Sequence, residues 1–365
     1  MVEIVWCSPH PTHYNSYLFE HINDIEYVSF TSVFFYEKLI EYPWGENMTG
    51  KYSCYYLNYK FGIDYSLIFS LLRNRDKKLF IASWNNLTMI ILLSLSSLLR
   101  RPFILVSDTL PIKKRVGFKQ FLRKIWLKWI WEKSTAFLVT GDIGVKNCID
   151  LGVAKSKLIN FPFATNIDYF TPLKNRNLYN QTKKEWIFIS SGRLDIAHKG
   201  YDVAIKAFHK LKCNYPGLMF KYIIAGEGRD RGILEDMIAG HNLEQEVILK
   251  GWLEINELID FYHSGDVFIH PSNFDPYPNA VLEALACGLP IIGSSLAGSV
   301  LDRVKDNING FVFQAGDYEE LFNRLQDIMF LPMDEYLSMC NNARAVAEKW
   351  DIGYHIDRLK RIIKI

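Results

Sequence analysis

Two carboxylates, Asp275 and Glu283, lie eight positions apart in a segment whose surroundings suggest a shared site. Asp275 follows an apolar strand pattern that ends at His270, and Pro278 stands where a helix is expected to begin. The first amides of that helix and the Asp275 carboxylate should therefore face one point. The helix pattern ends at Gly288 before another apolar strand, which places Glu283 among apolar neighbours. An ionised side chain is unusual there without a function.

A second group of polar residues follows the strand expected at 186–191. Gly192, Arg193 and Lys199 occupy a loop that precedes a helix beginning near Tyr201. In open parallel sheets, a strand's carboxyl end, a glycine-containing loop and a helix N-terminus collect positive potential where anions bind. Two cations at this edge could neutralise the charge that develops on a leaving phosphate.

Short apolar strands alternate with helical patterns along the whole chain, as is typical of α/β proteins with parallel sheets. The polar segment 164–185 contains Pro172 and a run of Asn and Lys, and is expected to link two Rossmann-like halves. Strands are expected at 2–6, 25–30, 79–83, 103–107, 136–140 and 157–161, and then at 186–191, 219–225, 247–249, 267–270, 290–293 and 310–313.

The order of these motifs resembles the retaining glycosyltransferases of family four, the group one glycosyl transferases. Their signature is two Glu residues separated by seven positions, and here Asp275 and Glu283 stand in that order. The resemblance implies a GT-B fold, with two Rossmann-like domains whose parallel sheets face across a cleft and a C-terminal helix that crosses back. Residues 1–170 with 350–365 would bind the acceptor, and residues 171–349 would bind the donor.

The resemblance also implies roles for individual residues. Arg193 and Lys199 match the cations that hold the donor diphosphate, and Glu283 matches the carboxylate that binds the ribose hydroxyls. Asp275, one methylene shorter than the family's Glu, would contact the transferred sugar. Replacing Arg193 or Lys199 should lower turnover and leave folding nearly unchanged. Further donor-binding residues are expected at Gly192, Trp252, Leu253, Tyr277, Pro278, Asn279, Ala280 and Gly298.

Some of these positions have alternative interpretations. Trp252 would lie near the nucleotide base, although a Trp there could equally serve packing. In the first domain the resemblance places His13 and Asn15 on the acceptor side of the cleft, and Asp108 could replace, in catalysis, a His that helps position the sugar in many relatives. His13 could instead be an ordinary surface residue, and Asp108 a helix cap.

Composition narrows the class of protein. The 365 residues carry a formal charge of +2 and are 49% hydrophobic, which suits two domains with separate cores. The six cysteines are scattered, which favours a reducing cytosol. The chain has no Asp-x-Asp and no cluster with metal-ligand spacing. We therefore expect no metal and no cofactor, with a nucleotide diphosphate sugar of UDP or GDP type as the donor substrate.

Residues 113–133 contain eight cations and one acid, and apolar side chains recur between them at helical spacing. A basic, aromatic amphipathic helix suits the surface of an anionic membrane. A packed helix with a basic outer face, or a nucleic-acid patch, would give the same pattern, but no nucleic-acid fold signature accompanies it. We expect a cytoplasmic protein that lies peripherally on the inner face of the cell membrane.

The leading hypothesis is a retaining, metal-independent hexosyltransferase that moves a sugar from a nucleotide diphosphate sugar to a glycan or lipid-linked acceptor. Its pathway would be bacterial surface polysaccharide or lipopolysaccharide synthesis. A sugar-nucleotide epimerase of the same fold, or a catalytically silent sugar-nucleotide binding subunit, would use the same diphosphate site. Release of an altered sugar without an acceptor would indicate the epimerase, and binding without turnover would indicate the silent subunit.

Overall fold

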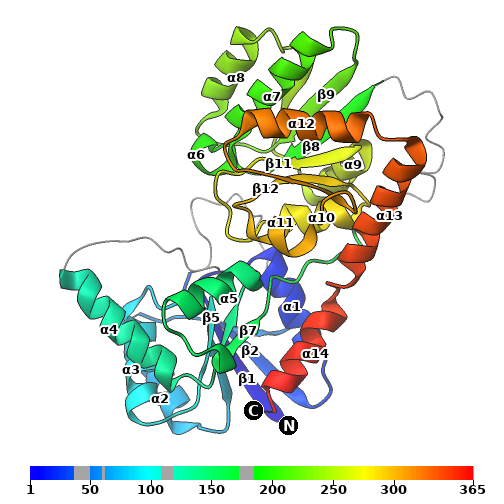
Figure 1. Ribbon diagram of the computed structural model, residues 1–365. Helices are drawn as coiled ribbons and strands as arrows, with labels where there is room; N and C mark the ends of the chain where they lie inside the picture. Colours follow the sequence, from blue (N-terminus) through cyan, green and yellow to red (C-terminus); the bar gives the residue numbers. More distant parts are fainter. Residues whose placement is uncertain (37–49, 60–61, 108–117, 172–184, 365) are drawn as a thin grey trace. The chain divides into compact units, whose positions relative to one another are not determined.

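The computed structural model describes residues 1–36, 50–59, 62–107, 118–171 and 185–364 (Figure 1). They form two compact units. Unit 1 comprises Met1–Thr165 together with Ile352–Ile365, and unit 2 comprises Asn166–Asp351. Each unit is a parallel sheet covered by helices, the arrangement that the alternation of strand and helix patterns predicted.

Unit 1 has a seven-stranded sheet in the order β3-β2-β1-β4-β5-β6-β7, and the strand pairs are parallel. The order reverses next to β1, as in doubly wound folds. The strands are β1 (Val2–Ser8), β2 (Val28–Phe34), β3 (Ser53–Tyr56), β4 (Lys78–Ile81), β5 (Ile104–Ser107), β6 (Ala136–Val139) and β7 (Leu158–Asn160). The helices are α1 (His13–Asn23), α2 (Tyr65–Arg73), α3 (Leu87–Leu98), α4 (Phe118–Lys133), α5 (Gly141–Asp150) and α14 (Ile352–Ile362).

The C-terminal helix α14 belongs to unit 1, although unit 2 separates it from the rest of that unit in the sequence. Its Leu359 and Ile362 are buried in the same apolar cluster as Phe19 of α1. The buried ring of His355 makes a hydrogen bond of 3.1 Å through Nε2 with Pro162 O. The predicted return of the last helix to the first domain is therefore confirmed.

Unit 2 has a six-stranded parallel sheet in the order β10-β9-β8-β11-β12-β13. The strands are β8 (Trp186–Ser191), β9 (Phe220–Ala225), β10 (Val247–Gly251), β11 (Val267–His270), β12 (Ile291–Ser294) and β13 (Gly310–Phe313). The helices are α6 (Ile196–Lys199), α7 (Tyr201–Asn214), α8 (Arg231–Gly240), α9 (Ile255–Ser264), α10 (Asn279–Ala286), α11 (Gly298–Arg303), α12 (Tyr318–Met329) and α13 (Met333–Glu348).

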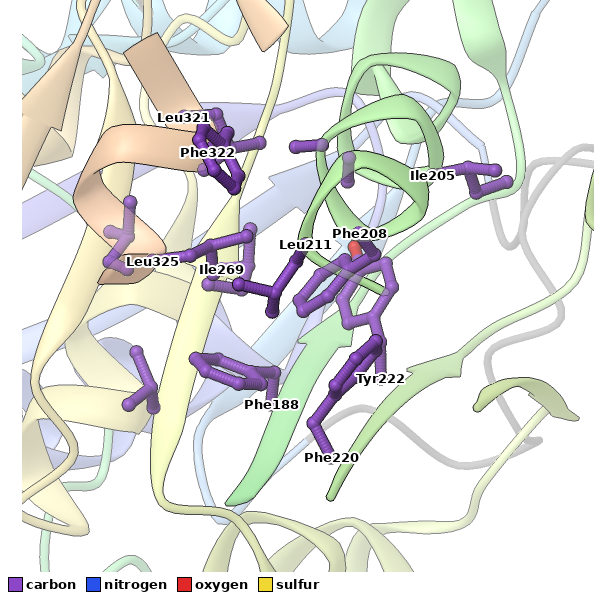
Figure 2. Close-up of a cluster of buried hydrophobic side chains, with 14 of the residues drawn as sticks. Phe188, Ile205, Phe208, Leu211, Phe220, Tyr222, Ile269, Leu321, Phe322 and Leu325 are labelled. Carbon is purple, nitrogen blue, oxygen red and sulfur yellow. The ribbon is translucent and has the colours of Figure 1, made fainter. Parts of the chain in front are cut away.

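One face of the unit 2 sheet is closed by α7 and α12 over an aromatic core, shown in Figure 2. Phe208 of α7 stacks on Phe220 and Tyr222 of β9, with ring centroids 5.4 and 4.5 Å apart. Burying a side chain of this size contributes about 1.5–3 kcal/mol. This packing makes the sheet a rigid platform for the loops at its carboxyl edge.

The elements differ from the sequence-based expectations at a few places. The strand expected at 25–30 is β2, which begins only at Val28, because Ile25 anchors a turn closed by the Val28 N–H to Ile25 O hydrogen bond of 2.8 Å. β3 was not expected, since this edge strand is mostly exposed and shows no apolar alternation. α6 was also missed, because it is a helix of four residues inside the Gly192 loop. Among the described helices, none is long and apolar enough to cross a membrane.

Candidate active site

The candidate site lies at the carboxyl edge of the unit 2 sheet. β8 and β11 are paired neighbours in the middle of this sheet, so the loops that follow them leave the sheet side by side. Gly192 begins the loop after β8, and Asp275 lies in the loop after β11. In open α/β sheets this edge is the usual place for ligands.

Glycines let the loops after β8 and β9 approach each other closely. Gly192 has a φ of +151°, and its N–H donates to Ala225 O at 2.9 Å. A Cβ on Gly226 would lie 2.0 Å from Gly192 O, and one on Gly228 would lie 2.4 Å from Leu194 O. Side chains at either position would therefore push the Gly192 loop out of place.

The short helix α6 fixes the position of Lys199. Asp195 caps it by accepting from the His198 N–H, and Gly200 ends it with a φ of +63°. A Cβ on Gly200 would lie 2.2 Å from Pro271 O, so this turn presses directly against the loop after β11. This contact between the two loops places Lys199 close to Asp275.

A buried ion pair joins the two loops. Lys199 Nζ lies 2.5 Å from Asp275 Oδ2, with 18% of the lysine and 12% of the aspartate side chain exposed. His270 Nε2 lies 3.5 Å from the same oxygen and 3.0 Å from Ser272 Oγ. A cation and an imidazole therefore converge on one carboxylate.

The surroundings of Asp275 hold its carboxyl group in the ionised form. Burial alone would raise its pKa, but the Lys199 ammonium and then the His270 ring outweigh burial and hold the pKa well below its ordinary range. Burial lowers the pKa of His270, and the Asp275 carboxylate offsets this only in part. At neutral pH the site thus contains one buried carboxylate, one ammonium and a neutral imidazole.

The Asp275 loop is held from the other side by the start of α11. The Asp275 N–H donates to Leu296 O at 3.1 Å, and the Gly298 N–H donates to Asp275 O at 3.0 Å. Ser299 Oγ donates to Pro278 O at 2.6 Å. A Cβ on Gly298 would lie 2.1 Å from Pro276 O, which explains why a residue without a side chain is needed there.

Glu283 lies on α10 and is 5% exposed. The Tyr262 hydroxyl donates to its Oε2 at 2.8 Å and also lies 2.7 Å from Ser191 Oγ at the end of β8. The predicted limits of this helix are confirmed: Pro278 is its N-cap, and Gly288, with a φ of +70°, follows its last turn. Helix geometry and a buried phenol together fix the carboxylate.

The other residues predicted for the donor site differ in accessibility. Arg193 is exposed on the same loop as Lys199. Trp252 follows β10 and is 41% exposed, with its Nε1 donating to Glu254 Oε1 at 3.2 Å, which weakens the packing interpretation. Leu253 packs partly against the apolar cluster under α10.

At the start of α10, Tyr277 is buried. The Arg303 guanidinium carbon lies 4.7 Å from the centroid of the Tyr277 ring. The Tyr277 hydroxyl donates to Asp302 Oδ2 at 3.1 Å. Its side chain therefore belongs to the packing with α11, and Pro278 is buried as well. Asn279 and Ala280 begin the helix and are half-buried.

Two of the unit 1 residues predicted for the site, His13 and Asn15, follow the carboxyl end of β1. His13 is the first residue of α1 and is exposed. Asn15 completes a capping box with Thr12: the Thr12 N–H donates to Asn15 Oδ1 at 2.7 Å, and the Asn15 N–H donates to Thr12 Oγ1 at 3.1 Å. The Asn15 amide also donates to His10 O at 3.0 Å, so this side chain shapes the loop. Asp108 lies outside the described residues.

Sequence reasoning missed the buried partners of the two acids, Tyr262 and His270. His270 carried a usable signal, because it is a polar residue at the carboxyl end of an otherwise apolar strand. Tyr262 carried none, since only the packing of α9 brings it to Glu283. Among the described residues, no group of three His, Cys, Asp or Glu side chains could hold a metal ion.

Comparison with known proteins finds similar sequences for part of the chain and similar folds for all of it. Residues 173–346 match the model of the family Glycosyl transferases group 1. Through this region the chain is similar to the group 1 glycosyl transferases. Over its full length the chain is similar to the crystal structure of HepE of Anabaena in complex with UDP, with a TM-score of 0.78, 15% identity and 100% of both chains covered. At that identity the likeness concerns the fold, and the fold is GT-B.

Two curated relatives show the extent of the sequence likeness. An uncharacterized glycosyltransferase of Haemophilus influenzae is 28% identical over 48% of each chain. A UDP-Gal:alpha-D-GlcNAc-diphosphoundecaprenol alpha-1,3-galactosyltransferase of Escherichia coli is 26% identical over 64% of this chain and 62% of its own length. The chain thus spans less than two thirds of the length of the curated relatives it matches.

Proposed function

We propose that this glycosyl transferase moves a sugar from a nucleotide diphosphate sugar to a lipid-linked or glycan acceptor, with retention of the anomeric configuration, in the synthesis of a surface polysaccharide. The observation that carries the proposal is the buried Lys199–Asp275 pair at the carboxyl edge of the unit 2 sheet. A buried ion pair is weak evidence of stability, so its position at a ligand-binding edge favours a functional role.

The diphosphate would bind next to the Gly192 loop. The Lys199 ammonium has three N–H donors, and Asp275 takes one of them, so the others can reach phosphate oxygens. Arg193 is exposed on the same loop and adds a guanidinium suited to bidentate phosphate binding. Both cations would stabilise the charge that develops on the leaving diphosphate.

Asp275 would orient the transferred sugar. Its carboxylate is ionised and can only accept hydrogen bonds, which suits sugar hydroxyls. We infer front-face displacement, in which the acceptor oxygen bonds to the anomeric carbon as the bond to the phosphate oxygen breaks. The acceptor proton passes to that leaving oxygen, so the atoms and charges balance without a further group.

Glu283 would bind the ribose. A carboxylate has about four lone-pair positions, so Glu283 can accept from ribose hydroxyls as well as from Tyr262. The base would lie near Trp252 and Leu253, beyond β9 along the same edge of the sheet. HepE binds UDP and the E. coli relative uses UDP-Gal, which favours a UDP-sugar as the donor.

A lipid-linked acceptor is supported by the E. coli relative, whose acceptor is a diphosphoundecaprenol. The first described turns of α4 suit such a substrate. Phe121, Leu122 and Ile125 are 60%, 51% and 52% exposed, and Arg123 and Lys124 between them are exposed as well. Exposed apolar side chains interleaved with cations suit the headgroup region of an anionic membrane.

The second half of α4 corrects the sequence-based expectation for 113–133. Ile130 and Trp131 are buried in the core of unit 1, and Trp129 packs partly against the same core. Trp126 Nε1 donates to Ser94 Oγ of α3 at 2.9 Å. The expected membrane stripe is therefore wrong for Ile130, which belongs to the core, and residues 113–117 lie outside the described residues.

A transfer assay tests the proposed reaction. The purified protein is incubated with UDP-glucose, UDP-galactose, UDP-GlcNAc or GDP-mannose and with a GlcNAc-diphosphoundecaprenol acceptor, and the products are identified by mass spectrometry. We expect one donor to be consumed while the acceptor gains one sugar. An altered sugar nucleotide formed without an acceptor, or tight binding with no turnover, would overturn the proposal.

Cosedimentation with vesicles tests the membrane surface. Arg123→Gln, Lys124→Gln and Lys128→Gln together should release the protein from anionic vesicles, because each basic residue near such a surface contributes about 1 kcal/mol. Lys146→Gln with Lys155→Gln changes two exposed lysines elsewhere in unit 1 and serves as the control. Equal pelleting of the triple variant and the wild type would exclude this surface.

A further inference from the structure

Unit 1 contains a polar hollow at the amino edge of its sheet. α3 and α4 both end there, just before β5 and β6 begin. The hollow has a volume of about 320 Å³ and its lining includes Ser96, Ser97, Arg100, Lys133 and Lys157. This volume is in the range of small-molecule sites. Ligands of open α/β sheets normally bind at the carboxyl edge of the sheet, where His13 follows β1 in unit 1. The hollow lies at the opposite, amino edge and is separate from that position.

Two cations of the hollow already satisfy the carbonyl groups around it. The Arg101 guanidinium, which is 1% exposed, donates to Leu71 O at 2.6 Å and to other carbonyl oxygens nearby. Lys157 Nζ donates to Glu132 O at 2.6 Å and Ser134 O at 2.8 Å at the end of α4. The negative helix ends are thus neutralised from within the protein.

Two further cations have no such task. Within the described part of the chain, the side chains of Arg100 and Lys133 make no hydrogen bond or ion pair. Arg100 has a φ of 52°, in the position after a helix where glycine is usual, and the Arg101 N–H closes this turn on Ser96 O at 2.8 Å. A non-glycine residue held there is a feature that function can explain. Four cations and the single acid Glu132 give the lining a formal charge of +3.

Two serine hydroxyls also lack partners. Ser96 and Ser97 in the last turn of α3 are 0% and 3% exposed, and their Oγ atoms have no hydrogen-bond partner among the described residues. Buried hydroxyls without partners are uncommon, because burial removes them from water without replacing the lost hydrogen bonds. Hydroxyl donors next to unpaired cations are the groups that bind phosphate oxygens.

We propose that this hollow binds the phosphate group of a phosphate ester, held by the side chains of Arg100 and Lys133 and the hydroxyls of Ser96 and Ser97. The ester is either a soluble phosphate or the headgroup of an anionic phospholipid. The proposal concerns unit 1 and does not depend on sugar transfer by unit 2. A phosphate ester bound at this edge is a ligand additional to the donor.

Calorimetry with glycerol 1-phosphate, in the presence of saturating UDP, tests the site. Arg100→Gln with Lys133→Gln should weaken binding at least about ten-fold, because two charge-assisted hydrogen bonds are lost. The control, Lys146→Gln with Lys155→Gln, removes the same charge from exposed positions outside the hollow and should keep the wild-type affinity. Equal affinity of both variants, or no binding by the wild type, would overturn the proposal.

Hydrogen exchange locates the bound phosphate, and Ser96→Ala with Ser97→Ala tests the hydroxyls. Glycerol 1-phosphate should protect amides in 99–103 and 132–136, whereas protection confined to unit 2 would contradict the site. The serine variant should lose affinity about five-fold without a lower Tm in the absence of phosphate, because hydroxyls without partners do not stabilise the free protein. Unchanged affinity would show that the hydroxyls do not bind phosphate.

Vesicles distinguish the two sources of the phosphate group. If the ligand is a headgroup, Arg100→Gln with Lys133→Gln should reduce pelleting with phosphatidylglycerol vesicles, and glycerol 1-phosphate should compete for the wild type. If the ligand is soluble, calorimetric binding should fall in this variant while vesicle binding stays at the wild-type level. A variant that matches the wild type in both measurements would eliminate the site.

Discussion

Replacing Lys199 with Met should destabilise unit 2, because it leaves a buried carboxylate without its cation. Lys199 Nζ lies 2.5 Å from Asp275 Oδ2, and both side chains are mostly buried. Methionine keeps much of the side-chain volume but not the charge. The sequence-based expectation was that loss of Lys199 leaves folding nearly unchanged. We now expect a loss of stability, because Lys199 is the cation paired with the buried Asp275 carboxylate.

The size of the effect depends on whether Asp275 stays ionised without its cation or takes up a proton in the variant. Removing one partner of a buried pair costs about 3–5 kcal/mol. Asp275 can instead take up a proton, which costs about 4 kcal/mol at pH 7 for a carboxyl with an ordinary pKa near 3.9, at about 1.4 kcal/mol per pH unit. The smaller cost prevails, so we expect the free energy of unfolding to fall by about 3–4 kcal/mol at pH 7.

The loss of unfolding free energy in the variant should become smaller as the pH falls. In the wild-type protein the depressed pKa of Asp275 contributes stability that is complete above about pH 4 and is lost only as the pH falls through the folded-state pKa. In the variant the folded state binds a proton that the unfolded state lacks between pH 7 and pH 5. Its deficit should therefore shrink by up to about 1.4 kcal/mol for each unit of acidification.

Urea unfolding followed by pulsed hydrogen exchange of β8 and β11 amides measures the stability of unit 2 separately from unit 1. The control is Lys199→Met with Asp275→Asn, which removes both charges and should recover most of the loss without a dependence on pH. A deficit equal at pH 7 and pH 5, or a double variant as unstable as the single one, would refute the reasoning.

Three further outcomes are expected. Arg193→Ala should lower turnover by about two to three orders of magnitude, the usual cost of losing one charge stabiliser, with the urea midpoint unchanged; wild-type kinetics would remove Arg193 from the site. Glu283→Gln should weaken UDP binding by about 1.5–3 kcal/mol in calorimetry, and undiminished affinity would show that Glu283 does not bind the ribose. Gly298→Ala should cost about 1–3 kcal/mol in urea unfolding, because its Cβ would meet Pro276 O at 2.1 Å; a wild-type midpoint would mean that the loop shifts freely.

Local rules predicted the parts of the site that depend on neighbouring residues. The helix between Pro278 and Gly288 needed only its start and stop signals, and most strands needed only apolar runs. Local rules cannot predict the contact between Lys199 and Asp275, because 76 residues separate them in the sequence. The pairing of β8 with β11 brings them together. The family resemblance assigned both residues to the binding of one donor molecule, but it did not predict the ion pair between them.

Features that depend on tertiary packing could not be predicted. Tyr262 gave no sequence signal, and its hydroxyl reaches Glu283 only because α9 packs beside α10. The apolar side chains of α4 share one helical spacing, yet Phe121 is exposed while Ile130 is buried against the α3 side of the sheet. Periodicity identifies a helix face but not what covers it.

The anomeric configuration of the first product tests the central claim most directly. Proton NMR can follow cleavage of a UDP-sugar by the wild type and by the Lys199→Met, Asp275→Asn double variant, which should fold. We predict that the wild type yields a product with the donor's configuration and that the double variant yields none at a comparable rate. An inverted product, or undiminished turnover by the folded double variant, would contradict the account.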